Sequence, residues 1–168
     1  IEDEHDVMRL EEDMIVHTLE KVKKDCAEQL EVLGKTVTIP KTPFPELEFP
    51  KLYDIFEKLD KPLAKNEDLN RESEEVLGNY VKEKFRSDFF FVNRFPSAVK
   101  PFYVMKVDDE PKWARSVDLM FKGMEMSSGG QRENRYDKLI SQAKEKGMNL
   151  EFLKWFTEVF LSFVFHFC

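Results

Sequence analysis

The residues with the most obvious chemical potential lie in one short segment, residues 123–132, with the sequence GMEMSSGGQR. Its carboxylate, Glu125, and its two serine hydroxyls are oxygen ligands that suit Mg²⁺, a hard cation that commonly bridges phosphates. The segment ends on Arg132, and an arginine fork suits bidentate binding of a carboxylate or a phosphate. The segment therefore indicates a site for an anionic substrate with Mg²⁺. An ordinary strand–turn–helix junction with a surface Glu and Arg is the alternative, since Ser-Gly-Gly is also common turn chemistry.

A strand and a helix are expected to position these side chains. The pattern over residues 116–126 predicts a strand, which would place Glu125 and Ser127 on one face and the neighbouring methionines on the other. The Ser-Gly-Gly sequence would end this strand, and its two glycines would let a backbone or a ligand approach closely. A helix is expected over about residues 132–146. Asp118, on the same predicted strand, would either orient the segment or pair across the sheet.

The rest of the chain predicts helices around a run of strands. Apolar residues three or four apart predict one long helix over residues 6–33, with Leu10 and Met14 on its apolar stripe and Glu12 on its polar face. The other expected elements are two short helices around 52–59 and 76–85, strands at 88–95 and 102–107, a polar link at 108–115, and a last helix capped by Asn149. Because the strands follow one another without alternating helices, we predict an α+β fold with an antiparallel sheet flanked by helices.

Composition and charge limit the class of protein. The 168 residues fit one domain, and the net charge of -7 makes the chain a poor stand-alone binder of polyanions. The two cysteines have no metal-ligand spacing, which favours a reducing, cytoplasmic setting. No apolar run reaches the ~18 residues of a membrane span. The start at Ile1, without a methionine, is typical of the middle of a longer protein.

Four segments, in the same order, resemble archaeal-type class II aspartyl-tRNA synthetases. Residues 123–133 are similar to the family's G-x-E-x-S-S-G-G-Q-R-E segment. Residues 95–105 are similar to its Y/F-P-x-x-x-K/R-P-F-Y-x-M strand pair. Residues 1–8 resemble the start of the helix after the family's motif 2, and residues 42–45 resemble a proline-rich link.

The resemblance implies a role for each of several residues. It implies that Glu125 contacts ATP and Mg²⁺, and that Ser128 helps to hold the metal and aspartate. Arg132 would bind the aspartate side-chain carboxylate, Gln131 would also contact the substrate, and Tyr103 would border the site. No residue of this chain is assigned as a catalytic acid or base. The implied activity is activation of aspartate with ATP and its transfer to tRNA, in a full-length parent that is a cytoplasmic homodimer without a membrane segment.

The chain also departs from the family pattern. The resemblance ends near Glu158, so we expect residues 1–158 to be part of a class II catalytic domain and residues 159–168 to be an atypical Phe-rich tail. The family's motifs 1, 2 and 3 and its anticodon-binding domain are expected outside this chain, which alone should be inactive and should leave most tRNA contacts to other regions. Asn134 stands where the family usually has His.

Three other functions stay open at this point. The first is an asparaginyl-type synthetase, and the second is a synthetase paralogue with another acceptor. The third is a non-catalytic interaction module derived from a truncated synthetase. The sequence also leaves open whether the parent charges tRNA-Asp alone or tRNA-Asn as well.

Overall fold

The structure is a computed structural model, which describes the backbone of residues 2–165 and the side chains of residues 2–158. The helices are α1 (Glu4–Asp25), α2 (Ala27–Val32), α3 (Phe49–Lys58), α4 (Arg71–Phe85), α5 (Tyr136–Glu145) and α6 (Leu150–Phe165). The strands are β1 (Glu46–Glu48), β2 (Phe89–Asn93), β3 (Lys106–Val107), β4 (Glu110–Ala114), β5 (Ser116–Phe121) and β6 (Glu125–Gly130). Within the described part of the chain, no helix is long and apolar enough to span a membrane.

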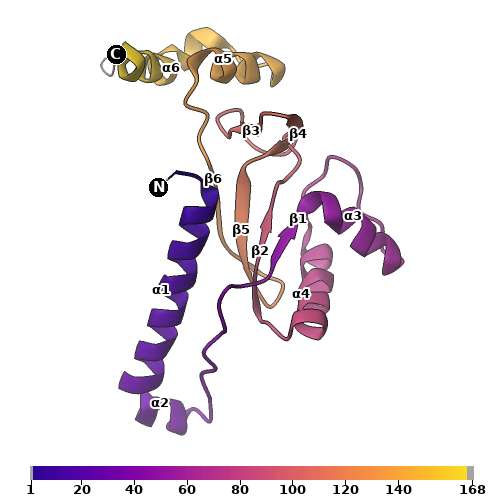
Figure 1. The fold of residues 1–168 in the computed structure, drawn as a ribbon, viewed down its shortest axis with the longest axis vertical. Coiled ribbons are helices and arrows are strands. Elements are labelled where there is room, and N and C mark those ends of the chain that lie inside the picture. The colour runs from indigo at the N-terminus through magenta and orange to yellow at the C-terminus, as the bar shows by residue number, and fades with distance from the viewer. Residues whose placement is uncertain (1, 166–168) are drawn as a thin grey trace.

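A four-stranded sheet lies at the centre of the fold, in the order β1, β2, β5, β6 (Figure 1). The pairs β2–β5 and β5–β6 are antiparallel, whereas β1 pairs with β2 in parallel. β3 and β4 form a separate two-stranded sheet. The predicted α+β fold with an antiparallel sheet and flanking helices is confirmed, and the parallel β1–β2 pair is an addition to it.

Helices cover the two faces of the sheet with different parts of the chain. Phe90 of β2 packs with residues of α3 and α4 in one core cluster, whereas its neighbour Phe91 packs with residues of α1 in another. Successive strand residues point to opposite faces, so one short run of phenylalanines serves both clusters. A third cluster joins Phe102 to α5 and α6, which lie beyond one end of the sheet in Figure 1.

The long helix predicted over residues 6–33 is interrupted at Cys26. This residue separates α1 from α2 and has φ -117° and ψ 27°, outside the helical range. The apolar spacing continues across the break, and a one-residue interruption therefore leaves no trace in the periodicity. The prediction of one continuous helix was wrong, although both pieces are helical.

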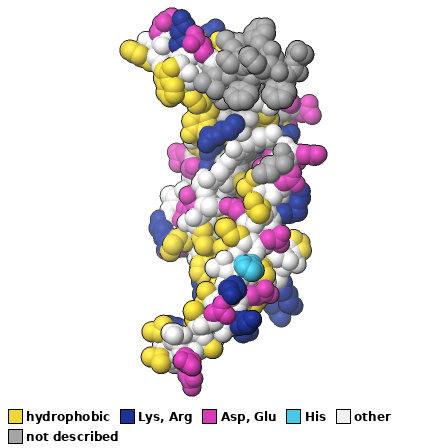
Figure 2. All heavy atoms as spheres, turned by 90° about the vertical axis from the view of Figure 1, so that its left-hand side faces the viewer, with side chains coloured by type: hydrophobic (Ala, Val, Ile, Leu, Met, Phe, Trp, Pro, Cys, Tyr) yellow, Lys and Arg dark blue, Asp and Glu magenta, His cyan; other side chains and the backbone are white. Residues whose placement is uncertain are grey.

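α1 also turns a different side to the sheet than its apolar stripe predicts. Glu12 is buried, whereas Leu10 and Met14 are 61% and 56% exposed. The carboxylate is accommodated inside because it accepts a hydrogen bond from the backbone N–H of Phe44, at 2.6 Å. Figure 2 views the molecule from the side of α1, where hydrophobic side chains are interspersed with charged ones. The sheet therefore covers only part of the apolar surface of α1.

The strand predicted over residues 116–126 is a hairpin. Lys122 and Gly123 have φ 53° and 72°, and Phe121 and Met124 exchange backbone hydrogen bonds across them. Positive φ at both central residues gives the twist that two-residue hairpins favour. Lys-Gly is a weaker turn signal than Asn-Gly or Asp-Gly, which is why the pattern did not reveal this turn. The Ser-Gly-Gly sequence consequently belongs to β6 and is not a turn.

Other boundaries differ where the elements are short. The strand predicted at 102–107 is reduced to β3, the link predicted at 108–115 contains β4, and β1 was not predicted. Asn149 caps the last helix as predicted, since its side chain accepts a hydrogen bond from the Glu151 N–H at 3.0 Å. The division after residue 158 stays a prediction, because the side chains of residues 159–168 lie outside the described part.

Candidate active site

A β-bulge decides which side chains of β6 share a face. Glu125 pairs with Met120 and Ser128 pairs with Asp118, while Ser127 pairs with Leu119. The register shifts between Leu119 and Met120, so one extra β6 residue is accommodated there. Paired residues of antiparallel strands project to the same face, and Glu125 therefore lies on the face of Ser128. The prediction that Glu125 shares a face with Ser127 was wrong, because simple alternation does not allow for a bulge.

Asp118 and Ser128 form a cross-strand pair on this face. The Ser128 hydroxyl donates a hydrogen bond to Asp118 Oδ1 at 2.6 Å. Burial raises the pKa of Asp118 to about 6, against the opposing effects of the Lys100 ammonium and the Ser128 hydrogen bond. The carboxylate is mostly ionised at pH 7 and accepts the hydrogen bond that Ser128 donates. The lone pairs of the Ser128 oxygen are then left for a cation or a substrate.

Lys100 is held between two carboxylates beside this pair. Its Nζ lies 3.6 Å from Asp118 Oδ2 and 3.6 Å from Asp68 Oδ2. It also lies 3.6 Å from the ring centroid of Phe95, and its side chain is 11% exposed. Neither Lys100 nor Asp68 was predicted as a site residue from the sequence, although Lys100 belongs to the strand pair that resembles the synthetases. Only the folded chain brings the loop before α4 next to β5.

Glu125 is an accessible carboxylate of this face, and its charge acts on the carboxyl groups of Glu74 and Asp118. It is exposed, and no hydrogen bond or ion pair joins it to another described residue. The described residues hold no group of three acidic, histidine or cysteine side chains that could bind a metal alone. A Mg²⁺ ion here would take Glu125 and Ser128 oxygens and complete its shell with phosphate or water oxygens, which is its usual manner of binding. The donor set fits the predicted metal.

Arg132 and Tyr103 lie together at the end of β6. The guanidinium carbon of Arg132 lies 4.2 Å from the ring centroid of Tyr103, a cation–π contact. Backbone hydrogen bonds hold the two segments together: the Met105 N–H donates to Gln131 O, and the Glu133 N–H donates to Tyr103 O. The guanidinium makes no hydrogen bond to another described side chain, so its N–H edge is available to a ligand. Arg132 lies before α5, which begins at Tyr136, and not in the predicted helix.

The side chain of Gln131 contacts different residues from those around Glu125. Its side-chain oxygen accepts a hydrogen bond from Arg115 at 3.3 Å, and the same Arg115 nitrogen lies 3.3 Å from Glu4. A hollow of about 510 Å³ lies here between β6 and the start of α1. Glu2, Asp3, Glu4 and Glu11 all line it, which makes it a poor place for phosphates. Ser128 and Arg132 also line this hollow, whereas Glu125 and Lys100 do not, so Ser128 and Arg132 lie where the two regions meet.

The two glycines of β6 differ in their surroundings. A Cβ at Gly130 would lie 3.0 Å from Arg115 O and 3.1 Å from a methyl carbon of Val104, so the predicted close backbone approach is confirmed there. A Cβ at Gly129 would meet no atom within 4 Å. A close approach of backbone is therefore found at Gly130 and not at Gly129, where the predicted approach of a ligand stays a prediction.

A family model described as tRNA synthetases class II (D, K and N) matches residues 1–164. The chain belongs to this family. The expected resemblance to archaeal-type aspartyl-tRNA synthetases is confirmed by curated relatives. The aspartate–tRNA(Asp) ligase of Thermococcus kodakarensis is 39% identical over 160 residues, which cover 95% of this chain and 36% of that protein. The aspartate–tRNA(Asp/Asn) ligase of Thermus thermophilus is 39% identical over 161 residues, which cover 95% of this chain and 37% of that protein.

Solved synthetase structures share the fold. The aspartyl-tRNA synthetase of Entamoeba histolytica aligns with a TM-score of 0.87 and 26% identity, over 95% of this chain and 34% of that one. The asparaginyl-tRNA synthetase of Pyrococcus horikoshii aligns with a TM-score of 0.79 at 23% identity, over 94% of this chain and 38% of that one. The chain thus shares its fold with a part of these synthetases, and it spans about a third of the length of the curated relatives it matches.

Proposed function

We propose that the full-length protein containing this chain is an aspartyl-tRNA ligase, which activates aspartate with ATP and transfers it to tRNA. The observation that carries the proposal is the Arg132 guanidinium, whose central carbon lies 4.2 Å from the Tyr103 ring centroid and whose N–H groups make no hydrogen bond to another described side chain. A planar fork fixed in this way matches the two oxygens of an aspartate side chain. Gln131 lies next in the chain and is proposed as a further substrate contact.

ATP and Mg²⁺ are proposed as cosubstrate and cofactor. Glu125 and the Ser128 oxygen would hold Mg²⁺, which neutralises phosphate charge when it is bound. Asp118 would accept the 2.6 Å hydrogen bond from the Ser128 hydroxyl and so keep the hydroxyl oxygen turned toward the ion. Lys100 would hold Asp118 in place from its other side.

The proposed reaction has two steps. An oxygen of the aspartate α-carboxylate forms a bond to the α-phosphorus of ATP, the bond to the β-phosphate oxygen breaks, and pyrophosphate leaves. A terminal hydroxyl of tRNA then attacks the acyl carbon, AMP leaves, and the hydroxyl proton passes to solvent. This chain's residues would contribute by positioning the substrates and by balancing charge, which can supply most of the acceleration of such a reaction.

Substitution of Arg132 tests the proposed function. In adenylate formation by the full-length protein, Arg132→Leu should lower the ratio of kcat/KM for aspartate over asparagine by about 100-fold, the value of a charge-assisted bond of ~3 kcal/mol. Arg132→Lys should also be poor, because an ammonium cannot reproduce the fork. A ratio that Arg132→Leu leaves intact would show that Arg132 does not read the side chain.

The same assay separates the alternatives. An asparaginyl-type enzyme would show pyrophosphate exchange with asparagine and little with aspartate. A non-catalytic interaction module would show exchange with neither amino acid. A homodimer of the full-length protein is part of the proposal, and sedimentation at micromolar concentration tests it.

A further inference from the structure

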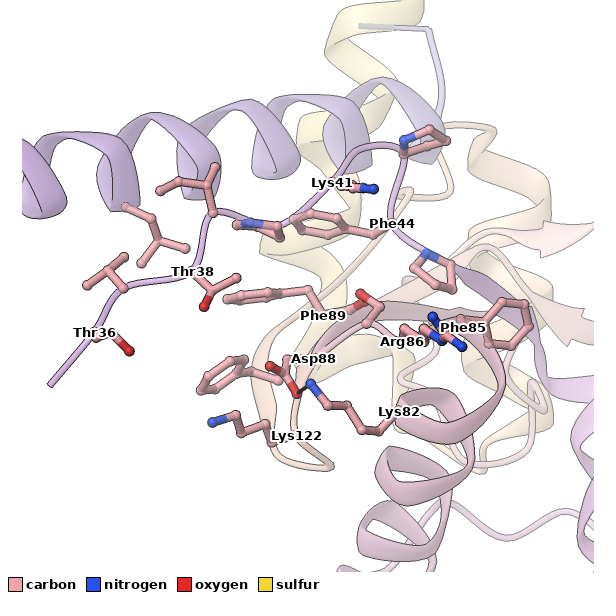
Figure 3. Close-up of a pocket in the computed structure, with 18 residues that line it drawn as sticks. Thr36, Thr38, Lys41, Phe44, Lys82, Phe85, Arg86, Asp88, Phe89 and Lys122 are labelled. Atoms are coloured by element: carbon pink, nitrogen blue, oxygen red, sulfur yellow. Dashed lines mark hydrogen bonds and ion pairs between the residues drawn. The ribbon is translucent and has the colours of Figure 1, made fainter.

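A large hollow among the described residues has a lining separate from that of the candidate active site. It has a volume of about 820 Å³, and none of Tyr103, Glu125, Ser128 and Arg132 lines it. Its walls are the extended segment after α2, the end of α4, the start of β2 and the β5–β6 turn (Figure 3). We call it the Lys41–Arg86 groove.

Positive charge gathers at this groove in an otherwise acidic chain. Lys41, Lys82, Arg86 and Lys122 line it, and Asp88 is the single carboxylate among its lining residues. Asp88 is already matched, because Lys82 Nζ lies 2.8 Å from its Oδ1. The other three cations have no carboxylate partner among the described residues. Three unmatched charges in a chain of net charge -7 form a local electropositive site.

The wall opposite α4 adds hydrogen-bond donors. Residues 36–39 are extended, and none of their backbone N–H groups donates to another described residue. Thr36 and Thr38 add two hydroxyls to the same wall. Free N–H groups and hydroxyls beside lysine and arginine are the donors that phosphate oxygens commonly use in proteins.

The side chains on the floor of the groove indicate which kind of phosphate ligand fits. Phe44 and Phe89 lie there with ring centroids 5.3 Å apart, and only 4% and 7% of each residue is exposed. Rings packed on one another in this way leave no face on which a base can stack, so Phe44 and Phe89 do not form the stacking platform of single-strand binders. Phe85, at the rim, is 46% exposed and is a more accessible ring of the groove. The cations are likewise exposed at the rim. This arrangement suits contacts to a sugar–phosphate backbone more than recognition of a base.

We propose that the Lys41–Arg86 groove binds the phosphate backbone of RNA. If the proposed function holds, the RNA is the tRNA substrate, and the groove is a tRNA contact that lies outside the amino-acid and ATP site. The net charge of the chain disfavours general polyanion binding, so this local cluster would supply the attraction.

The test measures the affinity of the full-length protein for tRNA over a range of salt concentrations. The variant is Lys41→Gln with Arg86→Gln, and the matched control is Lys23→Gln with Lys144→Gln. The control removes the same charge from exposed lysines of α1 and α5 that make no ion pair with a described residue. We expect the groove variant to lower the slope of log K against log salt by about 0.9 for each phosphate that is no longer neutralised, and to weaken binding by about tenfold at low salt. The control should leave both the salt slope and the tRNA affinity unchanged.

Several outcomes would overturn the proposal. Equal weakening by the groove variant and the control would point to net charge alone. Competition by inorganic phosphate or ATP at millimolar concentration would point to a small-anion site. A lowered melting temperature or altered oligomer in the groove variant alone would point to a protein segment as occupant. Aspartate-dependent pyrophosphate exchange, measured without tRNA, should be normal in both variants. Its absence from the unmodified protein would refute the proposed function and leave the groove testable with the same RNA.

Discussion

Gly78 is the residue whose substitution should most clearly connect packing to the candidate active site. It lies in α4, where the helix backbone touches the β5–β6 turn. A Cβ built at Gly78 would lie 2.5 Å from the Gly123 nitrogen, 2.7 Å from its Cα and 2.9 Å from the Lys122 carbonyl carbon. A Cβ at Gly123 would in turn lie 2.5 Å from Glu74 O. All of these neighbours are backbone atoms, so no side chain can rotate away to make room.

The expected cost of Gly78→Ala follows from these distances. Ordinary contact begins near 3.4 Å, so helix and turn must separate by about 1 Å. Overpacking of this kind typically costs about 1–3 kcal/mol. Alanine recovers up to about 1 kcal/mol of helix propensity, which leaves a net loss of up to roughly 2 kcal/mol. Because Glu125 lies two residues after Gly123, a shift of about 1 Å should also lower adenylate formation by up to about 100-fold.

The assay compares Gly78→Ala with Gly147→Ala in the full-length protein. Gly147 has φ +67°, and a Cβ there meets nothing within 4 Å, so alanine adds left-handed strain of about 1 kcal/mol without moving the hairpin. Both variants should lower the free energy of unfolding in urea, but only Gly78→Ala should lower aspartate-dependent pyrophosphate exchange. Normal stability and exchange in Gly78→Ala would refute the reasoning, and so would an equal loss of exchange in both variants.

Three further predictions concern charge and completeness. Glu125→Gln in the full-length protein should reduce adenylate formation by more than tenfold, a loss above ~1.4 kcal/mol, and should leave tRNA affinity unchanged. A smaller loss, measured by pyrophosphate exchange, would rule out Glu125 as a metal ligand in the transition state. Hydrogen bonds from Arg135 and Lys138 lower the pKa of Asp108 from 3.8 to about 2, so its stabilising contribution should be present above about pH 4 and lost as the pH falls toward 2. Asp108→Asn should show a smaller loss of stability than the unmodified protein across that window in urea unfolding, and identical pH profiles would contradict this account. The 168-residue chain by itself should catalyse no aspartate-dependent pyrophosphate exchange, and a rate above the blank would show that it holds a sufficient active site.

Local sequence determined which residue types are available for the chemistry. Glu125, Ser128 and Arg132 were singled out because their functional groups and their order along the chain are local properties. The same is true of α4 and β2, whose apolar patterns are visible in short windows. The family resemblance also rests on short ordered segments, which is why the amino-acid sequence alone is sufficient to recognise it.

Only the tertiary structure decided how these residues are combined. A bulge, which simple alternation does not reveal, turns Glu125 to the face of Ser128. Lys100 becomes part of the site because it is held between Asp118 and Asp68, residues 50 positions apart in the sequence. Glu12 is buried because Phe44, far along the chain, donates a hydrogen bond to it. Such pairings depend on how strands and loops meet in space, which local sequence does not contain. Each pairing also depends on whether the cost of burying a charged group is offset by a hydrogen bond or an ion pair.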